Sequence, residues 1–122
     1  MNLLNMFKAN IPTAGTVSAS YTATADGTTT GTIAAGINVA YVAGANSSKK
    51  VILPAPVKGV QLIVINQVAA QTLTVIGNGN TITINGVTGS PASITLAAAS
   101  SLFCIAISAT EWIVEQIATP IA

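Results

Sequence analysis

The residues that could carry chemistry in this chain are few, and they begin with its acidic side chains. The 122 residues contain one Asp and two Glu. Glu111 and Glu115 lie four positions apart in a segment with strand character, so both are predicted to face the same side. A pair of carboxylates on one face is what a glycosidase needs. Nothing polar surrounds this pair, however, and we favour an exposed strand at a sheet edge, where charge discourages unwanted pairing.

Most other catalytic arrangements are excluded by the residue types that are missing. The chain has no His, no Arg and a single Cys. Nucleophiles activated by His, zinc sites of the His and Cys type, and bidentate Arg clamps therefore cannot be built. The run Ser47-Ser48-Lys49-Lys50 satisfies the S-x-x-K pattern, but the helix start and the partner motifs of that enzyme class are absent. We predict a polar turn there, no catalytic, cofactor or metal site, and no enzyme activity.

The sequence also contains a cysteine and a Lys and Asn pair that could react, and we weigh each against a structural role. Cys104 lies inside the apolar run SLFCIAI, and we predict that it is a small buried hydrophobic residue. As the chain's one cysteine it cannot form an intrachain disulfide, which suits synthesis in a reducing cytoplasm. Lys58 and Asn66 are candidates for an autocatalytic isopeptide bond of the kind seen in surface adhesins, although nothing in the sequence singles them out.

Composition limits the class of protein further. Only 6% of the residues are charged and the net charge is +1, against about 25% charged residues in typical soluble domains. The mean hydropathy is +0.69. Four Lys without Arg make no basic stripe for nucleic acid, and no apolar stretch reaches the ~18 residues of a membrane span. We also expect no signal peptide. Much of the surface is therefore uncharged, or is covered by partners.

The elements that would position these residues are predicted to be short β-strands. Apolar residues alternate with Ser and Thr, and Gly, Asn and Asp separate the segments at intervals of 8–12 residues. We predict an all-β fold, a single compact β-sandwich or jelly-roll-like domain of about eight to ten short antiparallel strands. The expected strands cover residues 16–24, 37–41, 50–53, 60–65, 71–76, 81–84, 93–97, 101–107 and 111–117, with a weak strand or loop at 28–35. No internal repeat is evident.

The first residues differ from the rest of the chain. Leu3, Leu4, Met6 and Phe7 cluster before Pro12, in a segment too short for a stable isolated helix. We divide the chain into an N-terminal arm at residues 1–14 and a β domain at residues 15–122. The arm either docks on a capsid or a neighbouring subunit through those four apolar side chains, or it is a frayed or packed terminus.

The order of the short motifs in the second half resembles a known group of proteins. The motifs are Leu53-Pro54, a strand ending in Asn66, then TLTV, INGV, a Thr-Leu strand and a late Trp112. This order is similar to that of β domains in structural proteins of tailed bacteriophages, above all capsid decoration (cement) proteins and head fibres. The resemblance covers about half the chain.

The resemblance implies a function for the chain. It implies a homotrimer on the virion that binds the major capsid protein at the outer surface of the head, is made in the host cytoplasm, and contacts neither nucleic acid nor membrane. The alternative is a tail-fibre or tail-tip domain that recognises host surface glycans. A pilus-like bacterial surface subunit is a third possibility.

Overall fold

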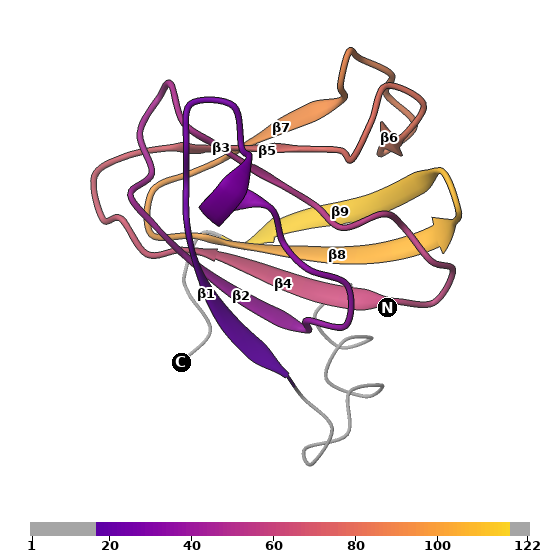
Figure 1. Ribbon diagram of the computed structural model, residues 1–122, viewed down its shortest axis with the longest axis horizontal. Helices are drawn as coiled ribbons and strands as arrows, with labels where there is room; N and C mark the ends of the chain where they lie inside the picture. Colours follow the sequence, from indigo (N-terminus) through magenta and orange to yellow (C-terminus); the bar gives the residue numbers. More distant parts are fainter. Residues whose placement is uncertain (1–16, 118–122) are drawn as a thin grey trace.

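The computed structural model describes residues 17–117, which form two stacked β-sheets (Figure 1). The all-β prediction is confirmed, since the described helical structure is one short 3-10 turn, η2 (Thr29–Gly31). The strands are β1 (Ser18–Thr22), β2 (Val39–Ala43), β3 (Lys50–Ile52), β4 (Gln61–Asn66), β5 (Leu73–Ile76), β6 (Thr83–Ile84), β7 (Ser93–Leu96), β8 (Ser101–Ser108) and β9 (Glu111–Ile117).

Most predicted strands agree with the structure to within two residues. The last one, at 111–117, coincides with β9. The weak segment at 28–35 contains η2 and a single bridge between Thr32 and Ile52. A turn at Asp26-Gly27 follows β1, and Gly27 has a φ of 83°. This conformation suits glycine, because a side chain there would be strained.

The predicted antiparallel pairing is wrong for four of the seven pairs of described strands. The six-stranded sheet has the order β1-β2-β4-β8-β9-β6 and the three-stranded sheet the order β3-β5-β7. The pairs β1–β2, β2–β4, β3–β5 and β6–β9 are parallel. From β2 to β5 the chain alternates between the two sheets. As a result, β4 runs parallel to β2 in one sheet, and β5 runs parallel to β3 in the other. The second sheet supplies the crossover connection that parallel strands require.

The result is a solenoid-like winding rather than the jelly-roll-like sandwich that we predicted. Val39 pairs with Ser18, 21 positions earlier, and Ile63 pairs with Val39, 24 positions earlier. In the other sheet Thr74 pairs with Lys50, again 24 positions away. One coil of the chain thus takes 21 to 24 residues, although the sequence shows no repeat of that length.

The last strands reverse direction and end the winding. β7 pairs antiparallel with β5, and β8 pairs antiparallel with β4. β8 then forms a hairpin with β9, with a register shift between Ala106 and Ser108. These pairings cover one side of the winding with hydrogen-bonded strands, as the terminal repeats of a solenoid must do.

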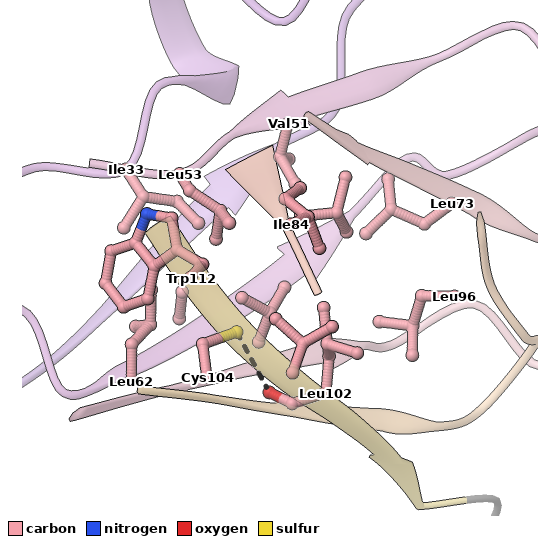
Figure 2. Packing of buried hydrophobic residues seen from close by; sticks show 14 of the residues in the cluster. Ile33, Val51, Leu53, Leu62, Leu73, Ile84, Leu96, Leu102, Cys104 and Trp112 are labelled. Atoms are coloured by element: carbon pink, nitrogen blue, oxygen red, sulfur yellow. Dashed lines mark hydrogen bonds between the residues drawn. The ribbon is translucent and has the colours of Figure 1, made fainter. Parts of the chain in front are cut away.

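The main core fills the space between the two sheets (Figure 2). Trp112 is fully buried and its indole Nε1 donates a hydrogen bond to the Pro54 carbonyl, at 3.2 Å. This bond joins the last strand of the large sheet to the segment that follows β3. Within residues 17–117 no helix is long and apolar enough to cross a membrane.

Candidate interaction surface

The two glutamates of the sequence analysis lie on the last strand of the six-stranded sheet. Glu111 and Glu115 belong to β9 and, as predicted, share a face, because Trp112 and Val114 between them point into the core. Glu115 pairs with Phe103 of β8 in an apolar part of the sheet. In the described part of the chain no group of three His, Cys, Asp or Glu side chains could hold a metal ion.

The S-x-x-K segment is a polar turn, as predicted. The Asn46 side chain accepts hydrogen bonds from the Ser48 backbone N–H and the Ser48 hydroxyl, both at 2.9 Å. The Lys49 N–H is bonded to the Asn46 carbonyl at 3.1 Å, and β3 begins at Lys50. No helix starts here, so the serine and lysine side chains lack the arrangement of that enzyme class.

The isopeptide candidates are not brought together. Lys58 is exposed before β4, whereas Asn66 is the last residue of β4. The intervening residues are largely in extended conformation, so the two side chains lie roughly 20 Å apart. The side-chain amide of Asn66 moreover bonds to Val68 and Gln71 in the segment after β4 and to Ala97 after β7.

Cys104 is the buried hydrophobic residue that the sequence predicted. Its side chain is inaccessible, and its thiol donates to the Leu102 carbonyl at 3.7 Å (Figure 2). Burial raises the pKa of this thiol far above its ordinary value. Since the thiolate is the reactive form, the folded protein keeps this group unreactive.

The feature that stands out is a second apolar cluster on the opposite face of the six-stranded sheet. Along β4, Leu62 and Val64 point into the main core, whereas Ile63 and Ile65 point away from it. The second cluster consists of Ile63, Ile65 and Phe103, with Val39, Ile105 and Ile117 packed around them. All six belong to β2, β4, β8 and β9. We call this the outer face, because the three-stranded sheet lies on the other side (Figure 1).

Two polar side-chain atoms lie within this outer face. Gln61 Oε1 and Ser101 Oγ are buried and have no hydrogen-bond partner among the described residues. Gln61 pairs with Ile105 and Ser101 pairs with Ile65, so the two atoms lie on either side of the Ile63–Phe103 row. Buried polar groups normally have partners. The outer face therefore combines apolar contacts with two places for a hydrogen bond.

The open edge of the same sheet is the second unusual surface. In the described part of the chain β1 pairs only with β2. No charged residue occurs from Val17 to Ala25, and three of the five residues of β1 are exposed. Edge strands usually carry Lys or Pro, which blocks pairing with other chains. This edge has neither.

The predicted docking residues Leu3, Leu4, Met6 and Phe7 lie outside the described residues, as does the predicted boundary between residues 14 and 15. The sequence analysis missed the outer face as a surface. The signal was present, because residues 62–65 and 102–107 are apolar at successive positions, which indicates strands that are covered on both sides. A comparison with known proteins finds no matching family model, no matching curated protein and no matching solved structure.

Proposed function

We propose that this chain is a virion structural protein without catalytic activity, a capsid decoration (cement) protein that binds the outer surface of a phage head as an oligomer. The observation that supports it most is the uncharged edge strand β1, which pairs with β2 alone among the described strands. Few charges and exposed main-chain groups suit repeated contact between identical subunits. The order of sequence motifs from Leu53-Pro54 to Trp112 supplies the link to phages.

The physical basis would be the addition of many small interfaces. A decoration protein contacts its own copies and the major capsid protein, and each contact can be modest in area. Because every subunit is held at several points, the second and third contacts are intramolecular events with a high effective concentration. A shell coated in this way resists expansion and loss of subunits.

The alternative of a glycan-binding tail domain has less support. Sugar recognition commonly uses exposed aromatic rings. Among the described aromatic residues, Trp112 and Phe103 are fully buried, and Tyr21 is partly buried with its hydroxyl accepting a hydrogen bond from the Ala34 N–H. Tyr41 is the one exposed aromatic residue between positions 17 and 117. One exposed ring is a poor platform for a glycan.

The first experiment measures the mass of the full chain in solution. We expect a homotrimer, with three times the chain mass of 12.1 kDa, in size-exclusion chromatography with light scattering. Ser20→Lys places a charge in β1 and should shift the trimer toward monomer, while Ser47→Lys, in the turn before β3, should not. A stable wild-type monomer would contradict the proposed oligomer.

The second experiment tests the location. Antibodies raised against the purified chain are applied to phage particles from the source culture, and the particles are imaged by electron cryo-microscopy. We expect label and regular density over the head surface. Label confined to the tail would favour the receptor-binding alternative, and unlabelled particles would reject a role in the virion.

A further inference from the structure

The exposed fractions on the outer face require a covering segment. Phe103 is 0% exposed, Ile63 7% and Ile65 9%, and the described members of the cluster all belong to the sheet itself. A side chain in the middle of an open sheet face can be screened by its neighbours on the sides, but not from above. The three-stranded sheet and η2 lie across the main core (Figure 1). They cannot cover this face.

We propose that the outer face is the binding site for this chain's own N-terminal segment, through Leu3, Leu4, Met6 and Phe7. Two stretches lie outside the described residues. Residues 118–122 contain one large apolar side chain, Ile121, whereas residues 1–16 contain those four together with Met1 and Ile11. Only the N-terminal stretch carries enough apolar surface to cover a patch of six large side chains. This inference concerns the single subunit and does not depend on a role in the virion.

The connection is long enough for binding within one chain. The segment enters the described structure at Val17, next to β1 at the sheet edge. From β1 the Ile63–Phe103 row lies two to three strands away, which is about 10–15 Å at the usual strand spacing. The nine residues from Lys8 to Thr16 can span up to about 30 Å when extended. A tether of this length gives binding within the chain a large advantage over binding to a second copy.

The N-terminal segment also carries charged and polar groups that complement those of the outer face. Glu115 of β9 pairs with Phe103 of β8, and Lys8 directly follows Phe7. A segment that places Phe7 on the apolar row can bring the Lys8 ammonium near the Glu115 carboxylate. Its main-chain and side-chain polar groups can also reach Gln61 Oε1 and Ser101 Oγ, which would give these buried atoms hydrogen-bond partners.

Disulfide trapping in the full chain tests the proposal directly. In a Cys104→Ala background, Phe7→Cys is combined in turn with Ile63→Cys, Ile105→Cys or Ile117→Cys, and each protein is oxidised at low concentration. We expect at least one pair to give a cross-linked monomer with increased mobility in non-reducing electrophoresis. The control pair Phe7→Cys with Ser47→Cys, an exposed position at the three-stranded sheet, should stay reduced.

Each other outcome of the trapping would overturn the proposal. Disulfide-linked dimers from the outer-face pairs would show that a second copy occupies the site. No cross-link in any outer-face pair, or equal cross-linking of the Ser47→Cys control, would show that the segment does not bind there.

A thiol-accessibility assay provides an independent measurement. Ile105→Cys in the Cys104→Ala background reports cover over the outer face by its labelling rate. We expect Phe7→Ser and Lys8→Glu each to raise that rate several-fold, and Glu115→Lys to restore it in the Lys8→Glu protein. Labelling of Ser47→Cys serves as the control and should not change. If neither substitution in the segment alters the rate at Ile105→Cys, the proposal is wrong.

Discussion

Replacing Asn66 with Ala should remove a buried polar connection between three parts of the chain. Asn66 ends β4, is 1% exposed and donates from Nδ2 to the carbonyls of Gln71 and Ala97, at 2.8 and 3.2 Å. Its Oδ1 accepts from the Val68 N–H at 3.0 Å. The side chain therefore fixes the turn into β5 and ties it to the segment between β7 and β8. Alanine leaves one donor and two acceptors without these partners.

The magnitude follows from the number and the burial of these bonds. A buried hydrogen bond contributes about 1 kcal/mol net, and a partner left unsatisfied costs about 1–3 kcal/mol. Some of the exposed groups will gain water, so we expect Asn66→Ala to lower the free energy of unfolding by about 3 kcal/mol in total. For a chain of this size that corresponds to a fall in Tm of roughly 12 °C. Domains commonly have about 5–15 kcal/mol of stability, so the variant should still fold.

Asn46→Ala is the matched control, because Asn46 makes the same kind of turn with its side chain. Its Oδ1 also accepts from the N–H two residues ahead, that of Ser48, at 2.9 Å, but these bonds are exposed. We expect a loss below about 1 kcal/mol, since water replaces the side chain. Urea unfolding followed by Trp112 fluorescence measures both variants. Equal losses for the two, or a loss at Asn66 below 1 kcal/mol, would refute the argument that burial sets the cost.

Three other predictions concern single side chains. Cys104 should not react with a thiol reagent in the folded protein and should react fully in urea, because it is buried with a raised pKa; fast labelling without denaturant would contradict its placement. The hydrogen bonds from the Thr28 hydroxyl and N–H lower the pKa of Asp26 from 3.8, so its stabilising effect is present above that value and is lost as pH falls through the lowered pKa. Asp26→Asn should therefore reduce the acid dependence of Tm, and identical pH profiles would count against it. Trp112→Phe removes the indole N–H from the Pro54 carbonyl and should lower stability by about 2–3 kcal/mol in calorimetry; an unchanged Tm would show that this bond is dispensable.

The positions of the strands could be predicted from the sequence because they depend on local patterns. Alternation along 71–76 places Leu73 and Val75 on one face, and the structure buries both. Asn85-Gly86 turns the chain where expected, with positive φ at both residues. The Asn85 side chain additionally bonds to the N–H and carbonyl of Val114, at 2.7 and 3.2 Å. A pattern of turn residues does not reveal such a distant partner.

The pairing of the strands could not be predicted, because it depends on which sheet each strand joins. Consecutive strands usually pair with each other, and this expectation leads to an antiparallel sandwich. Here it holds for β8 and β9, which share a sheet and a tight turn. From β2 to β5 each strand joins the sheet that its predecessor does not. An antiparallel sandwich and the observed parallel arrangement require the same alternation of apolar residues, because in both each strand buries one face against the other sheet.

The outer face escaped prediction for a related reason. A strand that is apolar on both sides, as β4 is, indicates only that both sides are covered. In a sandwich of two sheets, the second side of such a strand has no third layer of strands to pack against. Ile63 and Ile65 therefore predict a further covering segment as soon as the sheets have been counted. If the N-terminal segment covers them, as we propose, its removal should expose Ile63 and Ile65 to solvent, so the truncated chain tests the fold as well as the surface.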